Sequence, residues 1–298
     1  LSIDSTRLEE ELSQDRIVIV AGFQGVTAEN EITTLGRGGS DTSAVALAAA
    51  LNADVCEIFT DVDGVYTTDP RIVPAAQKLS TISYDEMLEL ASLGAAVLQP
   101  RSVEVAKEFN VKIHVRSSFN ENTGTIVQGV DEMNRIVEKE MVVRGVAHDL
   151  NVAKVTLFDV PDIPGIAGKL FRALADEKIN VDMIIQSQQR DNITNISFTV
   201  AKDDLEKTNE VIAAVKDKIG ARDFSYDADV AKVSIVGAGM ITNPGVAAQM
   251  FEALAENNIN IEMISTSEIK VSCIIRADLI KKAVLVLHEA FELDQVAI

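Results

Sequence analysis

The sequence contains no tryptophan, and aromatic residues fill only 4% of its 298 positions. The hydrophobic fraction is nevertheless 47%, so a sizeable core has to be built from Val, Ile, Leu and Ala. Aliphatic residues of this kind are typical of α/β layers with buried parallel strands. The length favours about two domains.

Basic residues are also scarce. The chain has 27 Lys and Arg against 46 Asp and Glu, which gives a net charge of −19 at pH 7. We therefore expect no nucleic-acid partner, because such a partner calls for a basic face. An anionic substrate would have to be held by locally placed cations, by helix N-termini or by a metal ion, against the field of the whole protein.

Cysteines and long apolar runs are few as well. Cys56 and Cys273 lie far apart in apolar surroundings and are predicted to be buried, reduced thiols. No apolar run approaches the roughly 18 residues of a membrane span, and residues 1–15 are polar and acidic, unlike a signal peptide. We expect a cytoplasmic protein with no membrane partner. Residues 1–15 also predict a helix joined to an upstream segment, so a fragment or a processed subunit is expected.

Strand and helix signals alternate in the first part of the chain. Strands are predicted at 16–21 (RIVIVA), 54–59 (DVCEIF) and 112–116 (KIHVR), and helices at 42–51, 84–93 and 101–109. Ser83 is the expected N-cap of the second helix. The alternation predicts βαβ units around a mostly parallel sheet.

An internal repeat follows after residue 129. The segments AKVTLFDVPDIPGIAGKLFRALADEKINVDMIIQSQ, from Ala153, and AKVSIVGAGMITNPGVAAQMFEALAENNINIEMISTSE, from Ala231, align at their Pro-Gly, Ile-Asn and Met-Ile pairs. Each copy predicts a strand, a loop with Pro-Gly, a helix, two more strands and a second helix. With a closing strand this order is the ferredoxin-like motif, so we expect two paired modules.

The stretch TTLGRGGSDT (33–42) places three glycines and an arginine directly before an apolar helix. Converging N–H groups and the helix dipole favour an anion at such a terminus, and glycines let the backbone approach it closely. A Walker P-loop is excluded, because no lysine precedes a Ser or Thr here. The alternative is a structural turn capped by Ser40 or Asp41.

A second polar stretch, TDVDGVYTTDPR (60–71), follows a predicted strand. An EF-hand loop is excluded, because Gly64 is fourth from Asp61 rather than sixth. A nucleotide-facing loop fits the rule that ligands bind at the carboxyl ends of strands in open α/β sheets, and a plain surface turn is the alternative. The three histidines, His114, His148 and His288, have no metal-ligand spacing and are interpreted as structural, so no metal site is expected.

In the repeats, a Pro-Gly loop precedes each first helix and an Asn follows it. The helix N-termini suit a small carboxylate, and Asn180, Asp182 and Asn260 suit an amino group or a side chain. The pattern favours an amino-acid sensor, with a merely connecting turn as the alternative.

Several of these motifs, in fixed order, resemble the aspartokinase family. VAGFQG (20–25), TTLGRGGSDT, TDVDGVYTTDPR, SYDEMLELASLGA (83–95) and VRSS (115–118) look like the carboxyl half of its catalytic domain, and the repeats, above all NPGVAA (243–248) and ISTSEIKVS (264–272), look like its two ACT modules. The resemblance implies a partial amino-acid kinase αβα sandwich (1–130) followed by two ferredoxin-like βαββαβ ACT modules. The first module (150–224) is expected to be inserted into the second (141–149 plus 225–298).

The resemblance also implies an activity and its site. Family members transfer the γ-phosphoryl group of Mg-ATP to the side-chain carboxylate of L-aspartate, which gives 4-phospho-L-aspartate and opens lysine, threonine and methionine biosynthesis. The substrate is expected on Arg37, Gly38, Gly39 and Ser40, with Arg37 pairing a carboxylate. Arg37 and Asp41 are the expected catalytic residues, and Mg²⁺ is expected to be held through the phosphates. The residues expected to line the ATP pocket are Thr60, Asp61, Tyr66, Thr67, Thr68, Asp69, Pro70 and Arg71.

Regulation is implied in the same way. In the family, lysine or threonine binds at the ACT interfaces and inhibits, and ACT modules pair side by side in a homodimer or larger assembly. The matching positions are Asp162, Ile163, Pro164, Gly165, Ile166, Ala167, Asn180, Val181, Asp182 and Gln186 in the first module, and Val246, Ala247, Asn260, Ile261, Ser267 and Glu268 in the second.

Two departures from the family pattern matter. The K-[FY]-G-G motif that opens the family's catalytic domain does not occur in the sequence, and Gln99 stands where many members have histidine (GAAVLQP, 94–100). Activity of this chain alone therefore stays open, and a non-catalytic regulatory subunit or fragment that binds lysine or threonine is the alternative. A third possibility, a kinase acting on glutamate, acetylglutamate or UMP, fits less well because of the doubled ACT region.

Overall fold

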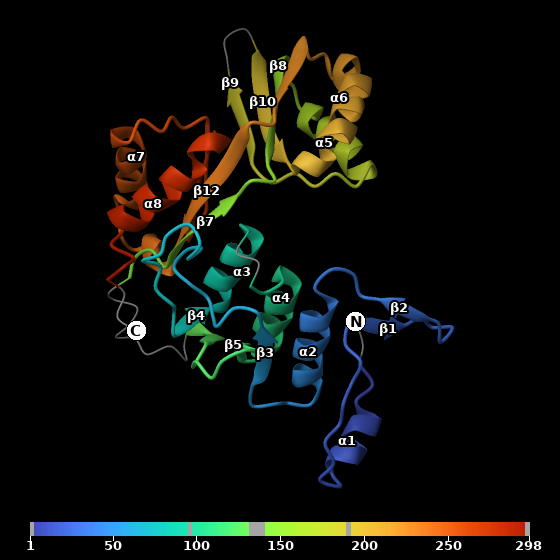
Figure 1. Ribbon diagram of the computed structural model, residues 1–298. Helices are drawn as coiled ribbons and strands as arrows, with labels where there is room; N and C mark the ends of the chain where they lie inside the picture. Colours follow the sequence, from blue (N-terminus) through green and yellow to red (C-terminus); the bar gives the residue numbers. More distant parts are fainter. Residues whose placement is uncertain (1–2, 95–96, 131–140, 189–191, 296–298) are drawn as a thin grey trace.

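The structure is a computed structural model that describes residues 3–94, 97–130, 141–188 and 192–295. Figure 1 shows a blue-to-green N-terminal portion with two further α/β modules above it. The N-terminal portion starts with α1 (Thr6–Leu12) and with a hairpin of β1 (Gln24–Val26) and β2 (Ile32–Thr34). Both project from the body of the protein in Figure 1.

A four-stranded sheet organises the N-terminal portion. Its strands are β3 (Cys56–Thr60), β4 (Thr81–Ser83), β5 (Ile113–Ser117) and β6 (Thr125–Gln128), and their order is β3-β5-β6-β4. The pairs β3–β5 and β4–β6 are parallel, whereas β5–β6 is antiparallel. The predicted strands at 54–59 and 112–116 are confirmed to within two residues, and one antiparallel pair qualifies the expectation of a mostly parallel sheet.

Three helices pack on this sheet: α2 (Gly39–Ala50), α3 (Tyr84–Ser92) and α4 (Pro100–Phe109). Their apolar faces and alternate residues of β3 and β5 form one core, which includes Val45, Ala48, Ile58, Met87, Leu90, Val103, Ala106, Ile113 and Val115. Ser83 caps α3 as predicted, in a capping box whose second half is the Glu86 carboxylate. The N-cap of α2 is Gly38, so the alternative interpretation, a turn capped by Ser40 or Asp41, is wrong about the cap.

The predicted buried strand at 16–21 is wrong. Residues 16–22 form no strand, and the side chains of Ile17 and Ile19 are 95% and 94% exposed. A strand needs a neighbour for its backbone hydrogen bonds, and no described segment pairs with this one. The apolar run therefore stays extended and uncovered.

The first α/β module is an antiparallel sheet covered by two helices. Its strands are β8 (Ala153–Pro161), β9 (Ile184–Gln188), β10 (Ile193–Val200) and β11 (Asp223–Asp227), in the order β11-β8-β10-β9. The helices α5 (Ile166–Asp176) and α6 (Leu205–Ile219) close a core that includes Leu157, Leu170, Leu174, Phe198 and Ile212. This is the ferredoxin-like order that the repeat predicts.

The second module has the same plan but takes its fourth strand from upstream. Its sheet order is β13-β14-β12-β7, with β7 (Gly145–Asp149), β12 (Val230–Val236), β13 (Met263–Thr266) and β14 (Lys270–Arg276). Helices α7 (Val246–Glu256) and α8 (Ile280–Ala290) pack on it. Strand β7 occupies the place next to β12 that β11 occupies next to β8. The first module thus lies between two strands of the second along the chain.

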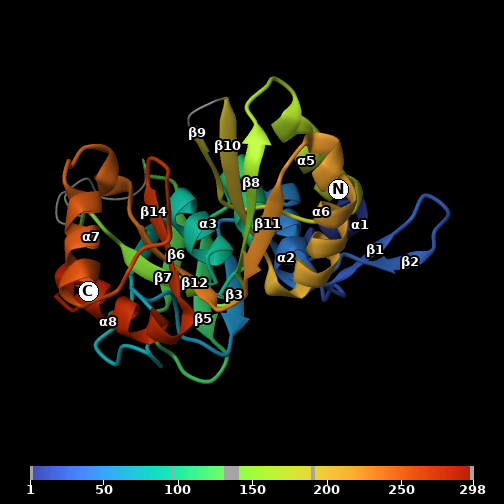
Figure 2. The same cartoon turned by 90° about the horizontal axis from the view of Figure 1, so that it is seen from above.

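The two modules meet at a small apolar cluster. Val152, Met183, Val230, Met263 and Ile274 are buried there, with Ile185 packed against them. Met183 and Met263 are equivalent positions of the repeat. The junction is therefore built from matching parts of both copies. Figure 2 shows the two sheets beside each other from above.

Candidate functional site

The glycine-rich turn before α2 has the backbone that its glycines permit. Gly36 and Gly38 have φ angles of 81° and 72°, which L side chains rarely adopt. A Cβ on Gly38 would lie 2.0 Å from the Cγ of Gln99, so the close approach also requires glycine. Arg37 is exposed beside the N-terminus of the twelve-residue helix. The turn thus presents a guanidinium and helix N–H groups at one place.

Asp41 lies in the first turn of α2. Burial raises the pKa of its carboxyl, although a backbone hydrogen bond from Gln99 acts in the opposite direction. Burial raises the pKa of the Cys56 thiol to about 11, and the negative charge of Asp41 is a second, smaller cause of this increase. Asp41 is therefore a partly desolvated carboxylate that faces β3.

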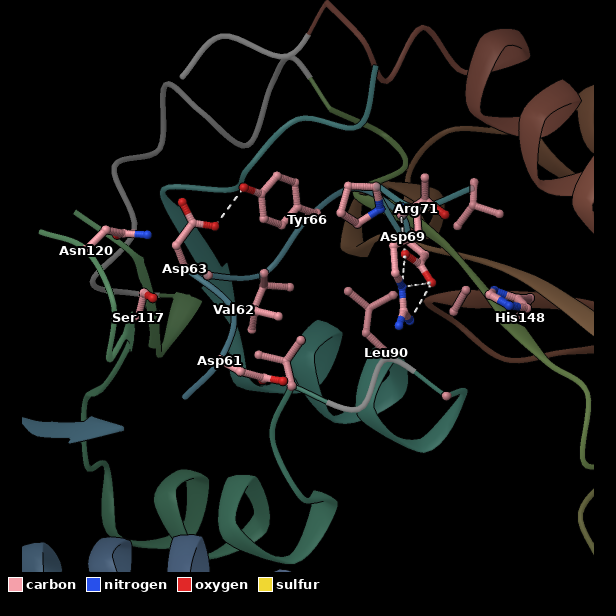
Figure 3. Close-up of a pocket in the computed structure, with 18 residues that line it drawn as sticks. Asp61, Val62, Asp63, Tyr66, Asp69, Arg71, Leu90, Ser117, Asn120 and His148 are labelled. Carbon is pink, nitrogen blue, oxygen red and sulfur yellow. Dashed lines mark hydrogen bonds and ion pairs between the residues drawn. The ribbon is translucent and has the colours of Figure 1, made fainter. Parts of the chain in front are cut away.

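The principal cavity of the site is formed around TDVDGVYTTDPR, with a volume of about 590 Å³. The loop (61–71) forms one side, Leu90 and Val97 contribute from α3 and the segment before α4, and Ser117 and Asn120 from the end of β5. Val146, Ala147 and His148 of β7 close another side. Figure 3 shows Asp61, Asp63 and Tyr66 at one end of the cavity and His148 at the other. A strand of the second module is thus a wall of this cavity.

At one end Asp63 and Tyr66 form a hydrogen-bonded unit. The Tyr66 hydroxyl donates to Asp63 (2.7 Å), which also accepts from Asn122 (2.7 Å) and pairs with Lys78 (3.3 Å). Burial opposes ionisation of Asp63, but these hydrogen bonds and the lysine charge together lower its pKa. Burial, and then the bond to Asp63, raise the pKa of Tyr66 to about 12. The phenol therefore stays protonated at neutral pH.

Farther along the loop Asp69 holds Arg71. The guanidinium donates to both carboxylate oxygens, at 3.0 and 2.8 Å, and the Arg71 N–H donates to Asp69 at 2.9 Å. These bonds lower the pKa of Asp69. The Arg71 side chain is 88% exposed, so its charge remains accessible to an anion from solvent.

The cavity accounts for six of the eight residues expected to bind nucleotide. Asp61, Tyr66, Thr68, Asp69, Pro70 and Arg71 line it. Thr60 lies outside the lining, where its hydroxyl donates to Asp61 (3.1 Å), and Thr67 faces the opposite direction. None of residues 37–41 is among the described residues that line the cavity, so the turn and the loop form separate parts of the site.

His148 is a cavity residue that the spacing of the histidines did not reveal. Burial lowers the pKa of its imidazole, while Asp69 and Asp149 act in the opposite direction. The pairing of β7 with β12 and the hydrogen bond from the Val146 N–H to the Thr67 carbonyl bring it to the loop, and no local pattern near residue 148 indicates these contacts. His114 and His288 contact Thr123 and Thr67, as structural histidines do.

The sixteen expected effector positions fall into several groups. In the first module Asp162 accepts from Gln186 (3.4 Å) near the start of α5, whereas Asn180, Val181 and Asp182 line a cavity of about 350 Å³ at the other end of the sheet. Ser267 and Glu268 line a third cavity of about 670 Å³. Ile166 and Val246 are buried in the module cores, so their side chains do not face a ligand.

The described part of the chain contains neither a metal-ligand cluster nor a membrane-spanning helix. Within it, no three or more His, Cys, Asp or Glu side chains are grouped to hold a metal ion. None of its helices is long and apolar enough to cross a membrane. Cys56 and Cys273 are free thiols and buried, as predicted.

Comparison with known proteins identifies the class first. The amino acid kinase family model matches residues 1–117, and the ACT domain model matches residues 159–215 and 233–291. The chain is thus an amino-acid kinase portion joined to two ACT domains. It is 51% identical to the aspartokinase of Mycolicibacterium smegmatis over 98% of this chain and 70% of that protein, and 53% identical to that of Corynebacterium glutamicum over 96% and 68%. The chain belongs to the aspartokinase family, a family of kinases.

Solved structures agree with this assignment. The crystal structure of Clostridium acetobutylicum aspartate kinase matches with a TM-score of 0.81 at 27% identity, over 91% of this chain and 62% of that chain. Escherichia coli aspartokinase III in complex with aspartate and ADP matches with a TM-score of 0.80 at 28% identity, over 96% and 63%. The chain therefore spans about seven tenths of the curated relatives and less than two thirds of these two solved chains.

Proposed function

We propose that the protein is an aspartate kinase that transfers the γ-phosphoryl group of Mg-ATP to the side-chain carboxylate of L-aspartate, giving 4-phospho-L-aspartate for lysine and threonine biosynthesis. The observation that supports this most directly is the cavity around TDVDGVYTTDPR, whose size and lining suit a nucleotide. The E. coli relative was solved with aspartate and ADP, which makes the same pair of ligands the natural candidates here.

The lining of the cavity has both parts that ATP requires. Leu90, Val97 and Val146 offer apolar contact for the adenine ring, and Arg71 offers a guanidinium for the phosphates. Mg²⁺ would be bound through the phosphates of ATP. Asp61 is exposed and lines the cavity, so its carboxylate could face that cation or its water.

The turn before α2 is the proposed aspartate site. Arg37 would pair a substrate carboxylate, and the backbone at Gly38, Gly39 and Ser40 would approach it closely. Asp41 is close enough to the turn to organise the transfer. Phosphoryl transfer depends on positioning and on neutralising charge, which these residues would supply without a covalent nucleophile.

The ACT modules are proposed to bind lysine, threonine or both, and to pair in a homodimer or larger assembly. The cavity at Asn180, Val181 and Asp182 also contains Lys232 and Lys270, so it offers both charges of a zwitterionic amino acid. E. coli aspartokinase III was also solved with lysine and aspartate. The proposed domains are the kinase portion (1–130), the first ACT module (150–224) and the second ACT module (141–149 plus 225–298).

The alternative is a regulatory subunit or fragment that binds the effector but does not turn over. It is supported by the cavity that contains Asp182, Lys232 and Lys270, which suits an amino-acid effector independently of any turnover. The deciding experiment is ADP production by this chain from Mg-ATP and L-aspartate, with and without lysine plus threonine. Aspartate-dependent turnover that the amino acids suppress supports the kinase. No turnover, together with calorimetric binding of lysine or threonine, supports the alternative.

A further inference from the structure

Thr67 lies within the loop of residues 61–71, here called the nucleotide loop, but its side chain points away from the cavity. Its side chain is completely buried, and its Oγ1 lies 3.0 Å from Nε2 of His288 in the last turn of α8. Its backbone carbonyl accepts a 2.7 Å hydrogen bond from the N–H of Val146 in β7. Both α8 and β7 belong to the second module. Two hydrogen bonds therefore attach the loop to that module at this residue, and Val73, just beyond the loop, is buried in the module's own core.

The backbones of the loop and of β7 are in close contact at this attachment. A Cβ on Gly145 would lie 2.8 Å from the Thr67 carbonyl oxygen, so the backbones touch where β7 begins. The Thr67 hydroxyl also accepts from the N–H of Gln77 (3.0 Å), and the Thr67 N–H donates to the Gln77 carbonyl (2.9 Å). One lone pair of the hydroxyl is thus used inside the loop. The hydroxyl donates to Nε2 of His288 in the tautomer that carries its proton on Nδ1, and accepts from Nε2–H in the other tautomer.

The neighbours of Thr67 along the chain are cavity residues. Tyr66 and Thr68 both line the cavity, and the Tyr66 hydroxyl holds Asp63. Thr67 is joined to each neighbour by a planar peptide unit, and only two dihedral angles per residue rotate easily. A shift of Thr67 therefore also shifts Tyr66 and Thr68. Small misplacements of binding groups are costly for positioning a substrate.

We propose that His288 is a positioning residue for the loop of residues 61–71, and that through Thr67 it contributes to the nucleotide affinity of the cavity. The proposal rests on the proposed function only where it names the nucleotide. The placement of the loop by His288 is independent of that function and can be measured without ligand.

The first test is amide hydrogen exchange on the full chain without ligand, comparing His288→Ala, His288→Gln and Thr67→Val with wild type. Loss of the bond in His288→Ala or Thr67→Val is expected to speed exchange at residues 65–79 about fivefold to tenfold, with residues 153–200 unchanged. His288→Gln should remain near wild type, because its amide can still meet the Thr67 hydroxyl. His114→Ala is the matched control, since His114 contacts Thr123 outside the cavity.

The outcomes separate the two proposals. Loop exchange at the wild-type rate in Thr67→Val overturns the positioning role, and it does so even if His288→Ala does not fold. Because Thr67→Val also removes the acceptor of the Gln77 N–H, faster exchange supports the role only at loop residues other than Gln77. The second test is calorimetric binding of Mg-ATP. Binding about fivefold weaker in Thr67→Val and His288→Ala, restored in His288→Gln and not additive in the double variant, supports the link to nucleotide. If the variants exchange faster in the loop but the wild-type chain binds no ATP, the positioning role is supported and only the nucleotide function is rejected.

Discussion

Lys232 and Asp182 pair across the junction of the two ACT modules, with Nζ 2.5 Å from Oδ2. The pair has a counterpart in Lys154 and Glu262, which make the same contact in the opposite direction. The lysines are 78 residues apart and the carboxylates 80, which are the offsets of the sequence repeat. Each module thus sends a lysine from its first strand to the helix–strand loop of the other. The junction is reciprocal in charge as well as in its apolar cluster.

We predict that the two members of the Lys232–Asp182 pair respond unequally to substitution. The Lys232 side chain is 6% exposed and that of Asp182 is 49% exposed. Asp182→Asn leaves a buried ammonium unpaired and should lower the free energy of unfolding by about 1–2 kcal/mol, less than for a fully buried pair. Lys232→Met removes the charge and should cost less than about 1 kcal/mol. Urea unfolding measures both.

The double variant is the control for this pair. Lys232→Met in the Asp182→Asn background should recover part of the lost stability, because no unpaired charge remains. A double variant as unstable as Asp182→Asn would contradict this account.

A second prediction concerns Glu86, which connects α3 to the second module. Its carboxylate accepts from the Ser83 N–H (3.2 Å) and hydroxyl (2.8 Å) and from the Ala238 N–H (3.0 Å), and it lies 3.7 Å from Nε of Arg144. Both side chains of the Glu86–Arg144 pair are buried. Glu86→Ala should therefore cost about 3 kcal/mol and separate melting of the N-terminal portion from that of the modules.

Glu89 provides the matched control on the same helix. It pairs with Lys270 of β14 at 2.8 Å, but the two side chains are 23% and 21% exposed. Glu89→Ala should cost less than about 1 kcal/mol and keep a single transition in scanning calorimetry. Equal effects of the two substitutions would show that burial does not decide the cost.

Local patterns predicted much of the fold correctly. The helices predicted at 84–93 and 101–109 are found at 84–92 and 100–109, because apolar periodicity and capping are properties of a few neighbouring residues. The failure at 16–21 has the opposite cause. Whether an apolar run becomes a buried strand depends on a partner strand from elsewhere, and Ile17 and Ile19 have none among the described segments.

The site was predictable to a similar degree. Loop residues such as Tyr66 and Asp69 follow a strand, and the structure places them in the cavity. Thr67 belongs to the same motif, yet it faces a histidine 221 residues away in the sequence. His148 enters the cavity through the pairing of β7. Both contacts are long-range, so no local spacing encodes them.

A third prediction concerns the thiols. Burial raises the pKa of Cys56 to about 11, with a contribution from Asp41, and that of Cys273 to about 12. At pH 8 the thiolate fraction of Cys56 is then about one in a thousand, so both cysteines should resist a disulfide reagent in the folded protein. Two thiols per chain should react in urea. Rapid labelling of either cysteine without denaturant would contradict its burial.

The same pKa values predict that the free energy of unfolding decreases at high pH. The folded pKa lies above the unfolded value of 9.0 for both thiols, so folding retains a proton that the unfolded chain releases. This contribution is complete below pH 9 and is lost as the pH rises through about 11 to 12. The midpoint of urea unfolding should fall over this pH range. The decrease from the value at pH 8 should be smaller for Cys56→Ala than for the wild type.

The last prediction concerns Arg37. Arg37→Ala should lower kcat/KM for aspartate about tenfold to hundredfold, since a charge-assisted pair with a carboxylate is lost, and should leave the KM for Mg-ATP unchanged. Arg37→Lys should recover little, because an ammonium cannot reproduce the planar fork. Arg222→Ala, which removes an exposed pair with Asp159, is the control. The measurement is the aspartate-dependent ADP assay or, if this chain does not turn over, calorimetric binding of aspartate. An unchanged response to aspartate in Arg37→Ala would exclude the turn before α2 as the substrate site.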